Sequence, residues 1–465
     1  MQPERRDAQQ APGNGFRPGS RREVVAMAWP LAVGMLAFTA MGVADTLLMG
    51  YVSTEAQGGV GLATIILFVL TAFFRGLLAG AQSVVAAADG ARDRDRIERA
   101  GGAGVWLGLG TGAVATILLE AVRVFLLPHL ADDRQVIAAA DTFLRAGLVL
   151  PLLTLTSQGF LSSIQGLGDS RTRMWASVWG NVTNVGLDLV LIFGLGFIPA
   201  LGAAGAAIAT VAGTAVMLLI YARRYQRLVG APRRPDGAVL RDAITLGLPA
   251  GTQQLMMSSA FLVTTVIIAQ AGATHLAANQ VLIHVLSVSF LPGFGIGEAS
   301  GILVGRALGA GQRALAAETL RSGRTVAVVV MGACGVFFAV GGGWLASLFN
   351  PDPAVQALVA QLLRIAAIFQ LFDAVAMVHI CVLRAAGDTR FSLVITAGCA
   401  WGITVPAAWL LGHHLSMGAI GAWLGVTVEI IVLAALTSWR VAGLGSGRIG
   451  RLDLLLGKTA APAPS

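Results

Sequence analysis

The chain has 465 residues, of which 56% are hydrophobic and only 12% are charged. A soluble protein carries about 25% charged residues to form a solvated surface, so this composition excludes an ordinary water-soluble domain and indicates that lipid surrounds most of the chain. The formal net charge of +8 does not indicate nucleic-acid binding, because the basic residues are scattered between hydrophobic stretches.

Long apolar stretches run through the sequence and predict transmembrane helices. About 20 apolar residues cross the hydrocarbon core as a helix, and inside lipid the backbone must satisfy its own hydrogen bonds. The stretches are too long and too rich in Ala, Leu and Gly to be barrel strands. In chain order, the expected helices are 22–51, 58–89, 98–127, 137–166, 171–197, 201–223, 241–271, 275–310, 316–348, 354–386, 390–413 and 416–441.

The segments outside these helices are polar. Residues 1–21 are rich in Pro, Gly and charge, and we expect a disordered cytoplasmic tail there. The first apolar stretch is too long to be the core of a cleaved signal peptide. Residues 224–240 are rich in Arg and Pro and are expected to form a cytoplasmic linker, and residues 442–465 a cytoplasmic C-terminal tail.

The arginines alternate between loops in a way that predicts the topology. The two terminal segments and the loops near 92–99, 171–173, 224–241, 313–321 and 390 carry most of them, whereas the intervening loops carry few. Loops rich in Lys and Arg face the cytoplasm. We therefore expect a multi-pass protein of the plasma membrane, the inner membrane in a bacterium, with an even number of spans and both termini in the cytoplasm.

The sequence repeats itself at a fixed spacing. The proline in MAWPLAVGM matches the proline in LGLPAGTQQ, and GLGDSRT matches AAGDTRF, both at an offset of 219 residues. We therefore expect an N-lobe of six helices at 22–223 and a C-lobe of six helices at 241–441. An even number of spans per half relates the lobes by a pseudo-two-fold axis along the membrane normal. The sequence thus predicts an all-α polytopic membrane protein with twelve transmembrane helices in two lobes.

Sequence motifs for enzymatic chemistry are missing. The Gly-Lys-Thr at 457–459 lacks the upstream glycine of a phosphate-binding loop, because Leu452 stands there. No HExxH, CxxC or GxSxG pattern occurs, and the three cysteines, Cys334, Cys381 and Cys399, lie in apolar stretches without metal-ligand spacing. We expect no enzyme activity, no ATPase and no cofactor.

Ionisable residues inside the spans are the main functional candidates, because a charge at the bilayer centre costs about 2.5–3.5 kcal/mol on insertion scales. Asp45 lies in the first span, Asp188 in the fifth, and Asn184 one turn before Asp188 on the same helix face. Two carboxylates with an amide and a hydroxyl form a hard-oxygen site for a proton or Na⁺. Alternatively, each aspartate forms a static pair with a buried arginine. Arg75 is the obvious partner, either as a structural ion pair or as part of the coupling network.

The second half carries a different set of polar residues in its spans. At the repeat offset, Asp45 corresponds to Thr264 and Asp373 to Thr154, so the scaffold repeats while the charges differ. We expect ion coupling in one lobe and substrate contacts in the other, although some of these residues are equally consistent with helix packing. The set comprises Glu298, Asp373 and Glu429 in the eighth, tenth and twelfth spans, with His284 and His379 nearby.

These features resemble the multidrug and toxic compound extrusion (MATE) family over nearly the whole chain. The similarity rests on the proline and DTLLMGY of the first span, on GEASGILVGRALGAGQ in the eighth, and on the paired GLGDS and AAGDT loops. Asp45, Asn184, Asp188 and Thr210 resemble the N-lobe cation site of the DinF-like branch. The resemblance implies that H⁺ or Na⁺ binds at these four residues and drives substrate release while the first helix bends near its proline, for which Pro30 is the matching position.

The second lobe departs from the other branch of the family. FQLFDA, with Asp373, resembles the acidic motif in the tenth helix of the NorM-like branch. That branch also has a glutamate eight residues after the proline of the seventh helix, where this chain has Met257. The departure favours coupling in the N-lobe, closer to the DinF-like branch, and leaves both H⁺ and Na⁺ open.

The functional prediction is secondary active multidrug efflux. Small lipophilic or cationic organic compounds would leave the cell against inward H⁺ or Na⁺ by alternating access, carried by a monomer that contacts membrane lipid and no nucleic acid. The alternative is a flippase or exporter of lipid-linked sugars or other amphiphiles on a related two-lobe fold. The cavities of such proteins tend to be more cationic, whereas the candidate sites here are largely acidic.

Overall fold

The structure, a computed structural model, describes residues 16–131, 133–194, 199–234, 236–349, 351–444 and 449. In these residues the chain forms helices and short connections, and no strand. The predicted tails at 1–21 and 442–465 lie mostly outside the described residues.

The helices of the first half agree with the predicted spans to within a few residues at most boundaries. Ser20 and Ser53 cap the first two helices, each accepting a hydrogen bond from a backbone N–H of the first turn. The helices are α1 (Arg21–Gly50), α2 (Thr54–Gly90), α3 (Arg94–Ala121, continued by a π-helical turn at Val122–Leu126 and a 3₁₀ turn at Leu127–His129), α4 (Arg134–Ala146), α5 (Leu150–Gly166), α6 (Arg171–Leu191) and α7 (Ala203–Leu228).

The second half repeats this order. Because α7 continues to Leu228 and the next helix begins at Gly237, the connection between the halves is shorter than the predicted linker at 224–240. The helices are α8 (Gly237–Gln270), α9 (Ala273–Gly309), α10 (Arg313–Phe349), α11 (Pro353–Ala385), α12 (Thr389–Cys399), the π-helical η4 (Ala400–Thr404), α13 (Val405–Ala407), the π-helical η5 (Ala408–His414) and α14 (Gly418–Val441).

The predicted helix at 137–166 is two helices. α4 and α5 meet at an angle of 52° across residues 147–149. Pro151 lies in the first turn of α5, and proline lacks an N–H and disfavours a helical conformation in the residue before it. The chain therefore bends within this span.

Twelve membrane spans can be counted in the part of the chain that the structure describes. Ten helices are long and apolar enough to cross a membrane, and the bent pair α4–α5 makes an eleventh. α6 is the twelfth, with 21 residues. Its composition is the most polar because Asn181, Asn184 and Asp188 lie within it. The predicted all-α fold of twelve spans is confirmed.

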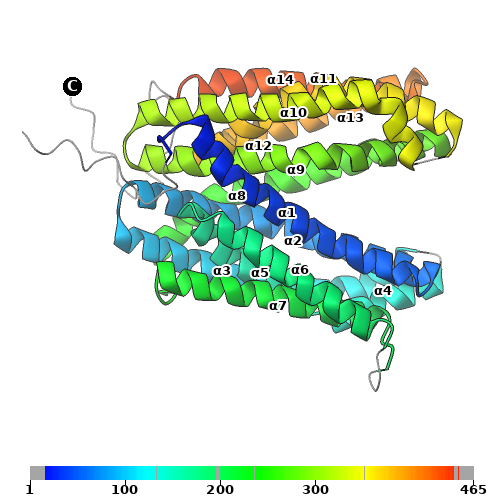
Figure 1. Cartoon of the computed structure of the whole chain (residues 1–465), viewed down its shortest axis with the longest axis horizontal. Coiled ribbons are helices and arrows are strands. Elements are labelled where there is room, and N and C mark those ends of the chain that lie inside the picture. The colour runs from blue at the N-terminus through cyan, green and yellow to red at the C-terminus, as the bar shows by residue number, and fades with distance from the viewer. Residues whose placement is uncertain are drawn as a thin grey trace, which may run out of the picture.

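The helices gather in two lobes (Figure 1). α3, α5, α6 and α7 pack together in the first lobe, and α9, α10, α11 and α14 in the second. α1 contacts both α6 and α9, and α8 contacts both α12 and α2, so one helix of each lobe also packs against the other lobe. In Figure 1 the lobes lie close together at the end near the C-terminus and diverge toward the opposite end.

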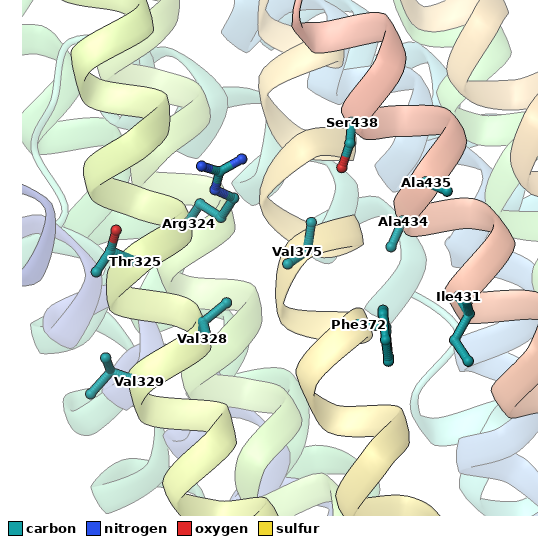
Figure 2. A pocket seen from close by; sticks show the side chains of 10 residues that line it. All are labelled: Arg324, Thr325, Val328, Val329, Phe372, Val375, Ile431, Ala434, Ala435 and Ser438. Carbon is teal, nitrogen blue, oxygen red and sulfur yellow. The ribbon is translucent and has the colours of Figure 1, made fainter.

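The outer face of the C-lobe carries a groove of about 540 Å³ between α10, α11 and α14 (Figure 2). Its walls are mainly aliphatic and aromatic side chains, with one arginine. The lining residues are Arg324, Thr325, Val328, Val329, Phe372, Val375, Ile431, Ala434, Ala435 and Ser438.

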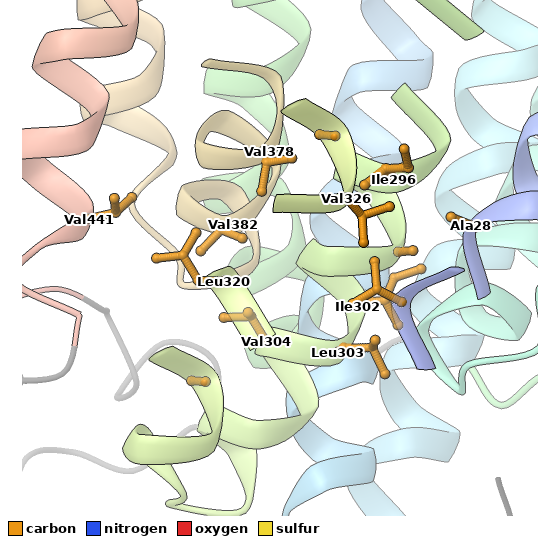
Figure 3. Close-up of a cluster of buried hydrophobic side chains, with 14 of the residues drawn as sticks. Ala28, Ile296, Ile302, Leu303, Val304, Leu320, Val326, Val378, Val382 and Val441 are labelled. Carbon is orange, nitrogen blue, oxygen red and sulfur yellow. The ribbon is translucent and has the colours of Figure 1, made fainter. Parts of the chain in front are cut away.

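A cluster of buried apolar side chains joins the lobes (Figure 3). It packs Ala28 and Leu31 of α1 against Ile296 and Leu303 of α9, and it continues into α10 and α11. Burial of apolar side chains contributes about 25 cal/mol per Å² removed from water, but inside a bilayer the lipid is equally apolar, so close packing holds these helices together instead.

Glycines allow the closest backbone approaches between the lobes. A Cβ atom on Gly90 would lie 1.9 Å from the carbonyl oxygen of Arg306, and one on Gly309 would lie 1.9 Å from that of Ala87. Gly90 and Gly309 are 219 residues apart, which is the repeat offset, so the same contact is made twice around the pseudo-two-fold axis. Both contacts lie at the ends of α2 and α9.

Ion pairs surround this end of the bundle, which we call the arginine-rich end. Arg306 of α9 pairs with Asp89 of α2 at 2.6 Å and joins the lobes. Within the lobes, Arg224 pairs with Asp169 and Arg440 pairs with Asp388, each at 2.7 Å. The repeated GDS and GDT motifs therefore form equivalent loops. Other arginines at this end are Arg21, Arg94 and Arg171, at the starts of α1, α3 and α6.

Candidate ion-coupling site

Three helices of the N-lobe bring the predicted N-lobe residues together. Asp45 lies on α1, 15 residues after Pro30, or about 22 Å along the helix axis. Asn184 and Asp188 lie one turn apart on α6, and both are completely buried. Because α1 and α7 both pack against α6, the polar face of α6 lies between these two helices.

Asp45 accepts two hydrogen bonds in this site. The Asn184 side-chain amide donates to its Oδ1 at 3.0 Å, and the Thr210 hydroxyl of α7 donates to its Oδ2 at 2.7 Å. The Asp45 side chain is almost completely buried. A buried carboxylate with donors on both oxygens is held in one orientation, with its negative charge partly compensated.

Asp188 lies beside Asp45 without such donors. Their side chains are close enough for a hydrogen bond between the two carboxyl groups when one of them carries a proton. Neither carboxyl oxygen of Asp188 has a hydrogen-bond donor in the described residues, and the same holds for the Asn184 carbonyl oxygen. Burying an isolated ionised carboxylate is very costly, so this arrangement requires a proton or a cation beside Asp188.

The contacts of Asp45 and Asp188 do not describe a static pair with arginine. In the described residues, the side chains around Asp45 are Asn184, Thr210 and Asp188. Arg75 of α2 has its guanidinium 5.8 Å from the centre of the Phe68 ring and lies near Arg173 of α6.

Glu298 belongs to the contact between the lobes. It lies on α9 and accepts a hydrogen bond from the side-chain amide of Gln82 on α2. Arg173 is close enough to interact with its charge. Glu298 therefore contributes to the interface near the arginine-rich end rather than to the cluster around Asp45.

The C-lobe contains a separate pair of carboxyls. Asp373 of α11 and Glu429 of α14 are close enough for their charges to interact. His379 is completely buried, with Nδ1 3.4 Å from the Thr437 hydroxyl, whereas His284 is exposed. Groups of three His, Cys, Asp or Glu side chains that would hold a metal ion are absent from the described residues.

Three polar residues of these networks were missing from the sequence prediction. Gln82 stands alone in an apolar stretch of α2, which was an available signal. Asn181 donates from its side-chain amide to the Ala37 carbonyl of α1 at 2.6 Å, and its spacing from Asn184 places both on one face of α6. Arg173 is counted with the loop arginines in the sequence, but it lies in the first turn of α6 and reaches the lobe interface.

The fold and the site together define a multi-spanning membrane transporter, with two helical lobes and buried carboxyls inside one of them. The MatE family model matches residues 30–190 and 249–410, two segments that follow the internal repeat. The chain belongs to the MatE family. Members of this family are transporters, so this protein is a transporter rather than an enzyme.

Relatives of similar length support this assignment. A probable multidrug resistance protein NorM from Pseudomonas syringae pv. tomato is 30% identical over 440 residues, which cover 90% of this chain and 95% of the relative. A protein of the same name from Thermotoga maritima is 28% identical over 426 residues, covering 90% and 91%. These relatives carry the NorM name, and the assignment to the DinF-like branch stays a prediction.

Solved structures share the fold. A MATE structure in the bent conformation superimposes with a TM-score of 0.83 at 23% identity, and an outward-facing multidrug resistance MATE transporter with 0.82 at 22%; each covers 92% of this chain and 97% of the other. A MOP superfamily transporter from Pyrococcus furiosus, described by a binding pocket of reverse polarity and a different function, superimposes with 0.81 at 23%, with the same coverage. One fold thus supports different pockets, and function must be argued from the residues of this chain.

Proposed function

We propose that the protein is a secondary active efflux transporter that exports small lipophilic or cationic organic compounds in exchange for inward H⁺ or Na⁺. Coupling occurs in the N-lobe, at Asp45, Asn184, Asp188 and Thr210. The observation that carries this proposal is the buried carboxyl pair, in which Asp188 has no hydrogen-bond donor in the described residues.

The cluster offers chemistry suited to a small monovalent ion. Its oxygens come from two carboxyls, one amide carbonyl and one hydroxyl, which are the hard ligands that alkali and alkaline-earth cations prefer. A proton shared between Asp45 and Asp188 would satisfy the same groups. Either ion neutralises buried negative charge, and its departure leaves a carboxylate that must find another cation or become hydrated.

Exchange requires that ion and substrate do not stabilise the same state together. An ion that binds one state more tightly shifts the equilibrium toward it by the difference in affinity. Pro30 lies inside the continuous helix α1, between the apolar cluster that anchors its start and Asp45. A proline inside a helix removes a backbone hydrogen bond, so Pro30 is a suitable hinge for coupling ion binding to movement of α1.

The direction of transport follows from the charge distribution. The arginine-rich end faces the cytoplasm of a bacterial cell, with both termini inside, because basic loops stay on the cytoplasmic side. The lobes meet at that end, through Arg306 and Asp89, so the described state is closed toward the cytoplasm. A membrane potential of 100 mV favours the entry of one positive charge by about 2.3 kcal/mol.

Residues outside the N-lobe cluster have supporting roles in this proposal. Arg75 and Glu298 belong to the network that closes the lobes, and Asp373 and Glu429 attract cationic substrate in the C-lobe. The transporter acts as a monomer and needs no cofactor besides the coupling ion.

The test is transport by the purified protein in liposomes, with a pH gradient and a Na⁺ gradient imposed separately. The efflux of a fluorescent organic cation is measured for the parent protein, Asp45→Asn and Asp188→Asn. We expect one gradient to drive efflux in the parent, and each variant to lose at least about tenfold, because a neutral amide neither binds a proton nor compensates a cation.

Glu318→Gln is the matched control, since Glu318 is a partly exposed carboxyl of α10 that pairs with Arg17 outside the cluster. It should transport like the parent. Equal efflux in the parent and in both aspartate variants would refute coupling at this site. Absence of cation efflux from the parent, together with movement of a lipid-linked sugar between leaflets, would favour the flippase alternative.

A further inference from the structure

The groove on the outer face of the C-lobe lies apart from the N-lobe cluster. It is bounded by α10, α11 and α14, and α10 and α14 lie on the outside of the bundle (Figures 1 and 2). Val329 in its wall is 64% exposed. In a membrane-spanning protein, such an exposed apolar surface faces lipid.

The groove changes in polarity along its length. Figure 2 shows Arg324 and Ser438 toward one end and Val329, Phe372 and Ile431 toward the other. Ser438 lies three residues before the end of α14, close to the arginine-rich end. The seven residues from Ile431 to Ser438 correspond to about 10 Å along the helix axis. The groove therefore runs from the polar edge of the membrane about 10 Å into its apolar interior.

The charge at the polar end is available to a ligand. Arg324 is exposed, and no ion pair with a carboxylate is formed by it in the described residues. The nearest titratable group known to interact with it is the buried His379, which is not an anion. The lining contains no carboxylate. An anion is therefore favoured at this end, whereas a cationic drug would meet a guanidinium without a counter-charge.

We propose that this groove binds an anionic phospholipid, with the headgroup phosphate on Arg324 and Ser438 and an acyl chain along Val329, Phe372 and Ile431. A guanidinium donates to phosphate oxygens in a bidentate geometry, and basic pockets between transmembrane helices on the cytoplasmic side bind anionic headgroups. The groove volume of about 540 Å³ is within the range of about 300–1,000 Å³ typical of small-ligand sites. The lipid would contact three helices of the C-lobe at once.

Native mass spectrometry of the purified chain in detergent tests the proposal, with added phosphatidylglycerol or phosphatidylcholine as the probes. We expect the parent to retain one phosphatidylglycerol in preference to phosphatidylcholine. Arg324→Gln should weaken phosphatidylglycerol retention about fivefold, as one basic residue near the membrane surface contributes. The matched control is Arg321→Gln, which removes an exposed arginine one turn away on α10 that does not line the groove.

A second pair of variants tests the apolar part without changing charge. Ala435→Trp fills the groove, whereas Val428→Trp adds the same side chain at an exposed position of α14 outside it. We expect only Ala435→Trp to reduce lipid retention. Equal losses in Arg324→Gln and Arg321→Gln, or equal retention of both lipids by the parent, would overturn the proposal. So would a dimer whose formation excludes the lipid, since the groove would then be an interface between copies of the chain.

Discussion

The N-lobe and the C-lobe share a scaffold but differ in chemistry. The loops of the GDS and GDT motifs form equivalent ion pairs, Asp169 with Arg224 and Asp388 with Arg440, at the same distance of 2.7 Å. The buried cluster around Asp45 has no counterpart at the repeat-related positions. Asp45 corresponds to Thr264 by an offset of 219 residues.

The same comparison holds for the rest of the cluster. At the offset of 219, Asn184 corresponds to Ile403 and Asp188 to Ala407. The C-lobe instead places its carboxyls on α11 and α14. Helix packing depends on small residues at crossings and on loop geometry, and these can repeat while individual polar side chains change. The difference teaches that the two-fold repeat builds the transporter, and that coupling is expected from one lobe.

The largest expected effect comes from removing the carboxyls of one lobe at a time. Asp45→Asn/Asp188→Asn should abolish gradient-driven efflux, whereas Asp373→Asn/Glu429→Gln should retain gradient dependence with a rate lowered less than about tenfold, because only the first pair is a coupling site. Efflux from liposomes with and without the gradient measures both. Loss of gradient dependence in the C-lobe double variant would break the proposed division between the lobes.

Thr210 and Thr264 allow a sharper comparison by a single hydroxyl. Thr210 donates to Asp45, whereas Thr264, the repeat-related counterpart of Asp45, bonds to the Ala260 carbonyl of its own helix at 2.9 Å. Thr210→Val should slow coupled efflux about tenfold, since a hydrogen bond to a charged group contributes about 1.5–3 kcal/mol. Thr264→Val serves as the control with little effect. Similar rates in both variants would contradict a role for the Thr210 hydroxyl.

The glycines at the lobe contact should behave alike in both lobes. Gly90→Ala and Gly309→Ala each place a Cβ atom 1.9 Å from a carbonyl oxygen of the opposite lobe. Each should destabilise the described state by about 1–3 kcal/mol, as overpacking does. Thermal unfolding in detergent measures the change, with Gly110→Ala as the control because nothing lies within 4 Å of its added Cβ. A lower Tm for only one of the two would show that the contacts are not equivalent.

The smallest expected effects come from the two loop ion pairs. Arg224 and Arg440 are partly exposed, so each pair should contribute less than about 1 kcal/mol to stability. The Arg440 guanidinium also lies 4.8 Å from the centre of the Phe391 ring, which adds about 0.5 kcal/mol. Arg440→Ala should therefore lower Tm slightly more than Arg224→Ala. The opposite order would exclude the ring contact as the source of the difference, and Phe391→Leu should remove that difference.

Most of the fold could be predicted because spans are local features. A run of apolar residues predicts a helix in lipid without knowledge of its neighbours. The break near Pro151 and the π-helical turns around Pro406 were not predicted, although both prolines were visible. Whether a helix with proline bends, breaks or widens depends on which neighbours satisfy the freed carbonyl groups.

The candidate site could be predicted in part. Charged residues in apolar stretches identify themselves, and the family resemblance grouped Thr210 with the aspartates. The roles of Gln82 and Arg173 at the lobe contact depend on partners far away in sequence: Gln82 bonds to Glu298, 216 residues later. Spacing within one helix carries no information about such a partner.

The sequence by itself determined the number of spans, their repeat and the polar residues placed in lipid, because the cost of exposing polar groups to hydrocarbon acts on each segment separately. Only the tertiary structure decided that Asn184 and Thr210 direct their donors at Asp45, that Asp188 lies beside it without donors, and that Arg75 lies by Phe68 and Arg173. These contacts depend on how helices cross and rotate, which the packing of many distant side chains settles together.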